Sequence, residues 1–401
     1  MHFVIVGAGV FGLLTAYSLT KQNHQVTIID THRPPPPLSA ANDYNKIIRA
    51  EYNDEIYVKL FLEAIDAWRN EFSLVYECGR ISVVPKHAGQ LQFEKSSIEM
   101  VRRFSKNNYE HLIGGKQLSQ RFLWLENNSF GEEVEFTYSP ESGLGRSSES
   151  LQLMLEKVLA TGYAKLINDE ILLVTDDGAR AKSGKAYTGE KYLVCCGANT
   201  GSIIDLNHQT SSSGMFVAHI QLSVQEYQKY YNMPIVFSSE LGYFFPPDPL
   251  TKKLKIAAVA EQCVNYGTSR KSFPITQTTI SSIHSCLEKS IPELAKHPVI
   301  DPKLCWFSDL AGSDFLIDQV PTSERVFVAT GDLGHAYKFL PTIGKYIYQR
   351  MVGTLDQGLR KKWRWKDAKK DHTVNWRVER GVIDLTDESE ATERKYSRHK
   401  L

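Results

Sequence analysis

Short apolar runs and helical periodicities alternate along the chain. Residues 3–6 form an apolar run that ends at a glycine, residues 13–22 follow with helical spacing, and residues 26–29 are apolar again. This order predicts a strand, a helix and a second strand at the start of the chain. Further apolar runs at 193–196 and 326–329 are typical of buried parallel strands.

The rest of the chain carries both kinds of pattern. Four prolines at 34–37 predict a loop, and residues 139–146 predict a turn-rich passage. The segment 216–262 is aromatic and strand-like. The remaining patterns predict helices at 55–72, 88–106, 147–160 and 341–351, and strands at 80–85, 242–245 and 254–256.

Parallel-strand signals in three separated places predict an α/β fold with a doubly wound, Rossmann-type dinucleotide-binding domain assembled from discontinuous segments. We assign 1–76, 138–212 and 311–356 to this domain. A smaller substrate domain with a mainly antiparallel sheet takes 77–137 and 213–310. After residue 357 the charge rises and apolar periodicity fades, so 357–401 is predicted to be a peripheral charged tail.

Charge and composition exclude several classes of protein. The 401 residues contain 47 Lys and Arg against 46 Asp and Glu, so the net charge of +1 gives no field that would recruit nucleic acid or an anionic membrane. The apolar N-terminal segment lacks a basic region before it, so we expect the start of a domain there and not a signal peptide. Six scattered cysteines form neither a disulfide framework nor a zinc spacing, which favours a reducing compartment and no metal site.

A glycine-rich turn links the first predicted strand to the helix. Gly7, Gly9 and Gly12 fit the G-x-G-x-x-G pattern, with Val10 and Phe11 between them. In this pattern the backbone approaches a pyrophosphate, which lies on the N-terminus of the helix. Asp30 ends the second strand, where an acid holds the adenosine ribose. The motif predicts a dinucleotide site but does not distinguish FAD from NAD.

Two distant motifs make that distinction. Residues 326–332, an apolar strand followed by Gly331 and Asp332, resemble the segment with which many FAD enzymes hold the ribitol. Residues 193–198, which include Gly197, resemble the intermediate strand motif of the same enzymes. In this order along the chain, the three motifs favour FAD.

The segment from Ser39 to Arg49, Ser-Ala-Ala-Asn-Asp-Tyr-Asn-Lys-Ile-Ile-Arg, resembles the monomeric sarcosine oxidase family, with its fungal relatives the fructosyl amino acid oxidases and the pipecolate and saccharopine oxidases. Three further patches agree with it: Leu-Lys-Ile at 254–256, Leu-Cys-Trp at 304–306, and residues 331–339. The resemblance runs from residue 1 to about residue 350 in family order.

The resemblance implies roles for individual residues. Taken alone, Cys305 between Leu and Trp is a buried structural cysteine, but its position matches the cysteine to which the family attaches the flavin 8α carbon as a thioether. Arg49 and Lys338 match the residues that clamp the substrate carboxylate. Lys255 matches the lysine whose positive charge promotes the reaction of reduced flavin with O2.

The resemblance also implies contacts around the flavin ring. Lys46 would lie near the flavin, and His335 would give electrostatic support beside its pyrimidine edge. Gly334 would let the backbone approach the ring closely. The expected cofactor-binding residues are Gly7, Gly9, Val10, Phe11, Gly12, Asp30, Ser39, Asn42, Lys46, Ile171, Gly197, Cys305, Gly331, Asp332, Gly334 and Lys338.

The chain departs from the fructosyl amino acid oxidases in two places. Those enzymes carry acidic residues after Leu-Lys-Ile and an aspartate-threonine pair after Cys-Trp, whereas this chain has four small apolar residues at 257–260 and Phe-Ser-Asp-Leu at 307–310. The differences favour a less polar or differently functionalised amine over a fructosyl substrate, and sarcosine, pipecolate, saccharopine and fructosyl amino acids all stay open as substrates.

The resemblance thus implies an FAD-dependent amine oxidase that oxidises the C–N bond of an N-substituted or cyclic secondary amino acid and reduces O2 to hydrogen peroxide. A flavin dehydrogenase with another electron acceptor, an oxidase of an N-methylated natural product and a flavoprotein without activity are the alternatives. We expect a monomer that binds a small amine or amino acid and O2, with no nucleic-acid or membrane partner. The C-terminal residues 399–401, His-Lys-Leu, differ from a peroxisomal address at one position, so the location is expected to be peroxisomal or cytoplasmic.

Overall fold

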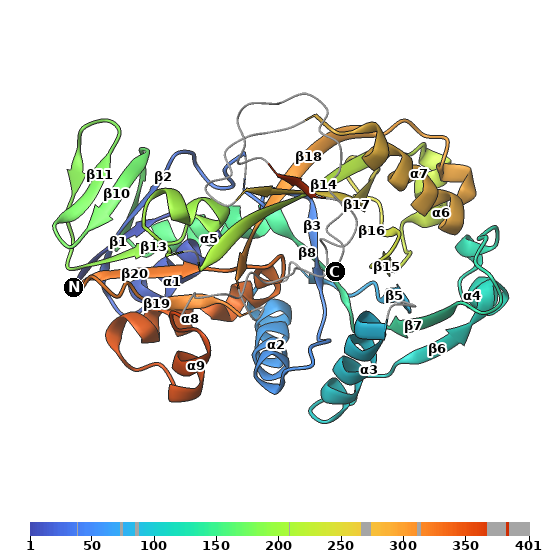
Figure 1. Ribbon diagram of the computed structural model, residues 1–401, viewed down its shortest axis with the longest axis horizontal. Coiled ribbons are helices and arrows are strands. Elements are labelled where there is room, and N and C mark those ends of the chain that lie inside the picture. Colours follow the sequence, from blue (N-terminus) through green and yellow to red (C-terminus); the bar gives the residue numbers. More distant parts are fainter. Residues whose placement is uncertain are drawn as a thin grey trace.

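The computed structural model describes residues 1–37, 39–72, 75–84, 88–207, 209–265, 274–310, 314–366 and 382–384. Two large sheets dominate this part of the chain, one in each half of the view in Figure 1. The first contains the N-terminal strand and the second contains the long strands that lead to the right-hand half of the molecule. The predicted tripeptide signal at 399–401 lies outside the described residues.

In the described part of the chain, six strands form the first sheet, in the order β19-β20-β13-β1-β2-β9. All neighbours are parallel except β19 and β20, which are antiparallel. This parallel sheet confirms the predicted α/β fold built from separated segments. The strands are β1 (His2–Val6), β2 (Gln25–Asp30), β9 (Ala164–Asn168), β13 (Lys191–Val194), β19 (Leu316–Gln319) and β20 (Val326–Thr330).

Alternation along β1 gives the first sheet two buried faces. Phe3 and Ile5 belong to the core beneath the helices, which are α1 (Val10–Thr20), α5 (Ser147–Ala160) and α8 (Leu340–Val352). Val4 and Val6 belong to the core on the other face, together with residues of β10 (Ile171–Thr175) and β11 (Gly178–Ala181). The short β12 (Ala186–Tyr187) completes that small sheet.

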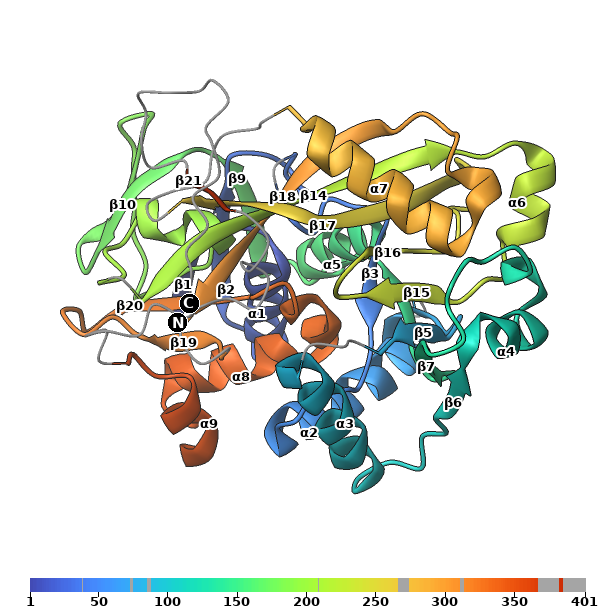
Figure 2. The same cartoon turned by 45° about the vertical axis from the view of Figure 1, so that its right-hand side comes forward.

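The second sheet has nine strands among the described residues, in the order β18-β14-β17-β16-β15-β5-β7-β6, with β21 beside β17. It is mainly antiparallel, as predicted for the smaller part of the fold. Helix α7 (Gln277–Ser290) lies along β17 on its outer face (Figure 2). The strands are β5 (Arg80–Val83), β6 (Glu110–Ile113), β7 (Glu135–Ser139), β14 (Thr210–Gln221), β15 (Ile235–Ser238), β16 (Gly242–Phe244), β17 (Lys253–Asn265), β18 (Ile300–Leu310) and β21 (Val382–Asp384).

The prediction of a turn-rich passage at 139–146 is partly wrong. Gly143–Arg146 forms strand β8, which pairs with β3 (Asn45–Ile48) and β4 (Val75–Tyr76) in a small antiparallel sheet. A Cβ atom on Gly143 would lie 2.2 Å from the carbonyl oxygen of Tyr76. The glycine is therefore explained by the close approach of the neighbouring strand and not by a turn.

Helix boundaries differ from the prediction by a few residues. The first helix begins at Val10, three residues earlier than expected, and the helix expected at 55–72 is α2 (Glu55–Ala67) followed by a π-helical turn, η1 (Trp68–Phe72). The remaining helices are α3 (Ala88–Arg102), α4 (Gly114–Arg121), α6 (Val224–Tyr230) and α9 (Gln357–Lys362), with short 3₁₀ turns η2 (Leu123–Leu125), η3 (Gly197–Ser202), η4 (Pro292–Leu294) and η6 (Ala336–Phe339). Among the described residues, no helix is long and apolar enough to cross a bilayer.

The prediction of a peripheral tail is wrong for residues 357–366. Helix α9 brings Trp363 into the core, where its side chain is fully buried against Phe315 and its backbone carbonyl accepts a hydrogen bond from Ile317 at 2.9 Å. Lys362 pairs with Asp54 and Asp314 at 2.6 and 2.9 Å. Because the segment is highly charged, the burial of its aromatic residue Trp363 was not predicted.

Replacing Trp363 with alanine is expected to destabilise the protein by about 3–5 kcal/mol, because it leaves a cavity in the core beneath the first sheet. Urea unfolding measures the change. The matched control is Leu123→Ala, since the Leu123 side chain is 78% exposed and its loss should change stability by about 0.5 kcal/mol or less. Equal effects of the two variants would show that the segment after 357 is not part of the core.

Candidate flavin-binding and substrate site

A cavity of about 760 Å³ extends from the carboxyl ends of β1, β2, β13 and β20 to the inner face of the second sheet. Most of the predicted site residues line it, although they are spread over more than 300 positions of the chain. They are Gly7, Gly9, Val10, Phe11, Asp30, Ser39, Lys46, Arg49, Ile171, Gly197, Lys255, Cys305, Asp332, Gly334, His335 and Lys338. Three predicted residues, Gly12, Asn42 and Gly331, do not line the cavity.

The dinucleotide end of the cavity is formed by the first turn of α1. Gly9 is its N-cap residue and makes no side-chain cap, and a Cβ atom placed on Gly9 would meet nothing within 4 Å, so the space before the helix is open. Gly12 has the opposite role, because its Cβ atom would lie 1.9 Å from the carbonyl oxygen of Gly7. Asp30 accepts a hydrogen bond from the backbone of Ala8 at 2.7 Å. This cradle fits a pyrophosphate on the helix N-terminus.

The segment after β20 is joined to β18. Oδ1 of Asp332 accepts a hydrogen bond from the backbone N–H of Ser308 at 2.6 Å, and the Ser308 hydroxyl accepts one from Gly331 at 3.3 Å. Gly331 therefore shapes the turn while Asp332 reaches the cavity wall. Cys305 lies on β18 in the same wall, with 1% of its surface exposed.

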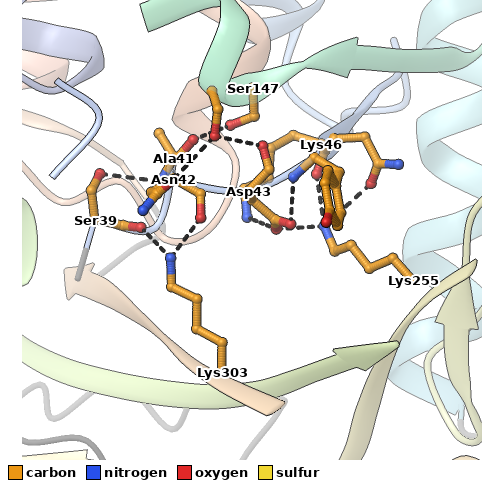
Figure 3. A network of polar contacts seen from close by, with 11 residues as sticks. Ser39, Ala41, Asn42, Asp43, Lys46, Ser147, Lys255 and Lys303 are labelled. Carbon is orange, nitrogen blue, oxygen red and sulfur yellow. Dashed lines mark hydrogen bonds and ion pairs between the residues drawn. The ribbon is translucent and has the colours of Figure 1, made fainter. Parts of the chain in front are cut away.

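A buried lysine projects into the cavity wall from β17. The ammonium group of Lys255 donates hydrogen bonds to Oδ2 of Asp43 at 2.5 Å and to the backbone carbonyl of Asn45 at 2.7 Å, and it lies 4.5 Å from the ring centre of Phe245. The same oxygen of Asp43 accepts a hydrogen bond from Lys46 at 2.8 Å. Figure 3 shows Asp43 between the two ammonium groups.

Burial and mutual charge shift the pKa values of this triad. Desolvation and the like charge of Lys46 outweigh the attraction of Asp43 and lower the pKa of Lys255 to about 8. For Lys46 burial also acts to lower the pKa, but Asp43 and then Cys305 outweigh it and raise the value. The pKa of Asp43 is lowered, since both lysines outweigh the effect of burial. Lys255 is therefore mainly protonated at pH 7 and loses its charge as the pH rises through about 8.

Arg49 and Lys338 meet at one aromatic ring, that of Tyr52. The guanidinium carbon of Arg49 lies 5.4 Å from the ring centre and the ammonium of Lys338 lies 4.7 Å from it. Lys338 also donates a hydrogen bond to the Tyr52 hydroxyl at 2.9 Å, and this hydroxyl is 3.1 Å from Nδ1 of His335. The structure thus brings the predicted carboxylate clamp together on one wall.

Arg49 contacts a residue of a buried ion pair, which Glu51 forms with Arg80. Arg49 donates a hydrogen bond to the backbone carbonyl of Glu51, and the Glu51 carboxylate lies 3.3 Å from Arg80. Burial acts to raise the pKa of Glu51, but Arg80, Arg49 and Lys338 outweigh it and the pKa is lowered. The ionised Glu51 therefore offsets part of the positive charge gathered behind the clamp.

Lys303 holds the loop that carries Ser39 and Asn42. Its ammonium donates hydrogen bonds to the backbone carbonyls of Ser39 at 3.0 Å and Asn42 at 2.6 Å, as Figure 3 shows. The Asn42 side chain itself points to the Pro37 carbonyl and to Ser148, away from the cavity. Asn42 thus helps to shape the loop, while Ser39 reaches the cavity wall.

Replacing Lys303 with methionine is expected to weaken cofactor binding at least tenfold, because two charge-assisted hydrogen bonds of about 1.5–3 kcal/mol each are lost from the loop at the cavity wall. The dissociation constant of non-covalent FAD, measured in a Cys305→Ala background, reports the change. Lys253→Met is the matched control, since Lys253 lies on β17, which β14 separates from β18, and pairs with the exposed Asp301 outside the cavity wall. Equal FAD affinity in the Lys303 and Lys253 variants would contradict the role of Lys303.

Sequence reasoning missed Asp43, Tyr52 and Lys303. Two weak signals exist: Asp43 lies inside the segment that carries the resemblance, and Lys303 precedes Cys305 by two residues, so both side chains project from the same face of one strand. Tyr52 follows Arg49 by three residues and gave no signal of its own. Among the described residues, no group of three or more His, Cys, Asp or Glu side chains could hold a metal ion.

Comparisons with known proteins agree with this geometry. The family model for FAD dependent oxidoreductases matches residues 2–350. L-saccharopine oxidase of Schizosaccharomyces pombe is 35% identical over 96% of this chain and 97% of its own length. A monomeric sarcosine oxidase of a Bacillus species is 25% identical over 87% of this chain and 92% of its own length. The crystal structure of fructosamine oxidase (amadoriase II) from Aspergillus fumigatus superposes with a TM-score of 0.87 at 23% identity, covering 99% of this chain and 98% of that one.

The chain belongs to the family of FAD dependent oxidoreductases. The fold, the family and the use of FAD that the sequence predicted are therefore confirmed, and the cavity residues fit this cofactor: an open helix N-terminus at one end, and a cysteine with a ring of cations at the other.

Proposed function

We propose that this enzyme oxidises the C–N bond of an N-substituted amino acid of the saccharopine type, with O2 as the electron acceptor and FAD attached to Cys305. The observation that carries the proposal is the meeting of Arg49 and Lys338 around Tyr52 in the same cavity as Cys305 and Lys255. Two cations on one wall suit a carboxylate next to the reacting nitrogen.

Sequence identity and the residues of the cavity wall support the proposed substrate class. The saccharopine oxidase matches this chain at 35% identity, against 25% or less for the sarcosine and fructosyl amine oxidases reported above. The wall also contains Gln90, Ser239 and Glu240, and the Ser239 hydroxyl donates a hydrogen bond to Gln90 at 2.7 Å. Polar groups beyond the carboxylate clamp suit a long substrate with a second polar end, such as a secondary amine that joins two amino acids.

In this proposal Arg49, Lys338 and Lys255 have distinct roles. Arg49 and Lys338 hold the substrate carboxylate and orient the C–H bond next to the nitrogen. The amine binds in its neutral form, so no protein base is required. Bound FAD supplies the two-electron acceptor for the oxidation. Lys255 places a fixed positive charge in the wall where the electrons pass to O2.

The electrons and protons balance over the cycle. The amine loses two electrons and two protons and becomes an imine, which water hydrolyses to a primary amine and a carbonyl compound. O2 gains the two electrons and two protons and becomes hydrogen peroxide. Equal molar yields of peroxide and carbonyl product from L-saccharopine, each measured by a coupled colour assay, test the proposal; carbonyl product without peroxide would indicate another electron acceptor.

The proposed covalent link between FAD and Cys305 leads to a separate prediction. Acid precipitation of the purified protein is expected to leave the yellow colour in the pellet, and Cys305→Ala is expected to release the flavin into the supernatant. Cys286→Ala is the matched control, since Cys286 is an equally buried cysteine outside the cavity wall. Acid-stable flavin in the Cys305 variant would contradict the link.

The predicted peroxisomal or cytoplasmic location stays a prediction. Fluorescent fusions with and without residues 399–401 test it, because removal of a working signal would move the fluorescence out of peroxisomes.

A further inference from the structure

Asp43 is a buried carboxylate held from three sides. Its side chain is 3% exposed, and Oδ1 accepts a hydrogen bond from the backbone of Tyr44 at 2.8 Å. The Asp43 backbone carbonyl accepts hydrogen bonds from both the N–H and the hydroxyl of Ser148, at the start of α5, at 3.0 Å each. The second carboxylate oxygen, Oδ2, is directed to the ammonium groups of Lys255 and Lys46.

This arrangement places two positive charges and one negative charge in the cavity wall. The two ammonium groups, that of Lys255 buried and that of Lys46 partly buried, repel each other and lose hydration, and a shared carboxylate between them offsets both costs. The net charge of the triad is therefore +1 when both lysines are protonated. Lys255 donates two further hydrogen bonds to Asn45, so its ammonium group has a fixed direction as well as a partner.

Other titratable groups face the triad from the surrounding elements. Burial lowers the pKa of His219 and raises the pKa of Tyr337, so both are neutral at pH 7. Lys303 is directed to backbone carbonyls. The groups that face the triad are His219 on β14, Tyr243 on β16, Lys303 and Cys305 on β18, and Tyr337 on η6. Asp43 exerts the largest electrostatic attraction on Lys255.

We propose that Asp43 is a positioning residue for the oxygen-reacting wall: its carboxylate holds the ammonium groups of Lys255 and Lys46 together and thereby keeps Lys255 charged at neutral pH. Asp43 acts through Lys255 and does not itself contact the reacting atoms. The inference rests on the proposed function, in which Lys255 faces the flavin.

The test follows the ionisation of Lys255 through the colour of the bound flavin. The visible spectrum of the oxidised holoenzyme, titrated from pH 5 to 10, is expected to show an inflection near pH 8 that Lys255→Met removes. In Asp43→Asn the inflection is expected about 1–3 pH units lower, because an opposite charge in contact with the ammonium is lost. In Lys46→Met it is expected above pH 8, because a repelling charge is removed.

The opposite directions of these two shifts separate the inference from general damage to the fold. Lys253→Met, on the same strand but paired with exposed Asp301, is the matched control and should leave the inflection in place. Flavin reoxidation by O2 provides the second readout: for a shift of this size, Asp43→Asn should be about fivefold or more slower than wild type at pH 8 and should come within about twofold of it at pH 5. An inflection that Lys255→Met removes but Asp43→Asn does not move would overturn the inference.

A different pattern identifies failure of the proposed function. If Lys255→Met changes neither the spectrum nor reoxidation, Lys255 does not face the flavin, and the role of Asp43 falls with it. If both the Asp43 and Lys46 variants shift the inflection in the expected directions while reoxidation stays constant, Asp43 sets the charge of Lys255 as inferred, but that charge does not serve oxygen.

Discussion

Lys255→Met is expected to slow the reoxidation of the reduced enzyme by O2 by about 100-fold or more, which is the usual effect of removing one preorganised charge from a reacting site. The residue is fully buried in the cavity wall and its ammonium is held by Asp43 and Asn45, so neither water nor a neighbouring side chain readily replaces it. Stopped-flow mixing of the reduced enzyme with oxygenated buffer measures this rate.

The reductive half of the cycle provides the control. Anaerobic reduction by the amine should keep its rate within a few-fold, because the carboxylate clamp on the other wall is unchanged. Lys253→Met should leave both rates unchanged, since this lysine of the same strand does not line the cavity and pairs with the exposed Asp301. Slow reduction with normal reoxidation would assign Lys255 to substrate binding and contradict its role with oxygen.

Removal of either cation of the carboxylate clamp is expected to raise KM. Arg49→Ala and Lys338→Ala should each raise KM by about 10- to 150-fold, because a charge-assisted hydrogen bond of about 1.5–3 kcal/mol is lost. Both cations lie against the Tyr52 ring, so the double variant should raise KM by less than the product of the two single increases. Steady-state kinetics with the amino acid substrate measure these changes.

A decarboxylated analogue of the substrate tests the origin of this effect. The analogue presents no carboxylate, so its KM should be nearly the same in wild type and in both variants. Arg103→Ala, which removes an exposed arginine outside the cavity, controls for the loss of a positive charge from the protein. Equal increases in KM for the acid and its analogue would contradict the clamp.

The sequence was sufficient to predict four strands of the first sheet, β1, β2, β13 and β20, because they are short apolar runs, with glycine motifs directly after some of them, as at 3–9 and 326–331. Strands β9 and β19 of the same sheet were not predicted. It was misleading where local composition opposed tertiary packing. The glycines of β8 indicated turns, but they occur because Tyr76 and Tyr337 approach the strand closely. The charged segment after 357 indicated a tail, but one aromatic residue, Trp363, fixes it to the core.

The candidate site was predicted from motifs, and its electrostatics were not. The resemblance indicated Lys255, Arg49, Lys338 and Cys305, and the structure places all four on one cavity. Their partners could not be predicted, because Asp43 lies 212 positions from Lys255. The pattern of one sequence does not show which distant residues are close in space. The charge balance of the triad could therefore be described only from the fold.

Amine oxidation by the bound flavin is tested most directly by anaerobic mixing of the purified, flavin-loaded enzyme, at a pH of about 7–8, with L-saccharopine, pipecolate, sarcosine and fructosyl-lysine. Loss of the flavin absorbance near 450 nm, where oxidised flavins absorb visible light, reports reduction. L-saccharopine is expected to bleach the flavin completely and faster than the other three compounds. Bleaching by dithionite but by none of these amines would contradict the proposed oxidation of a secondary amino acid.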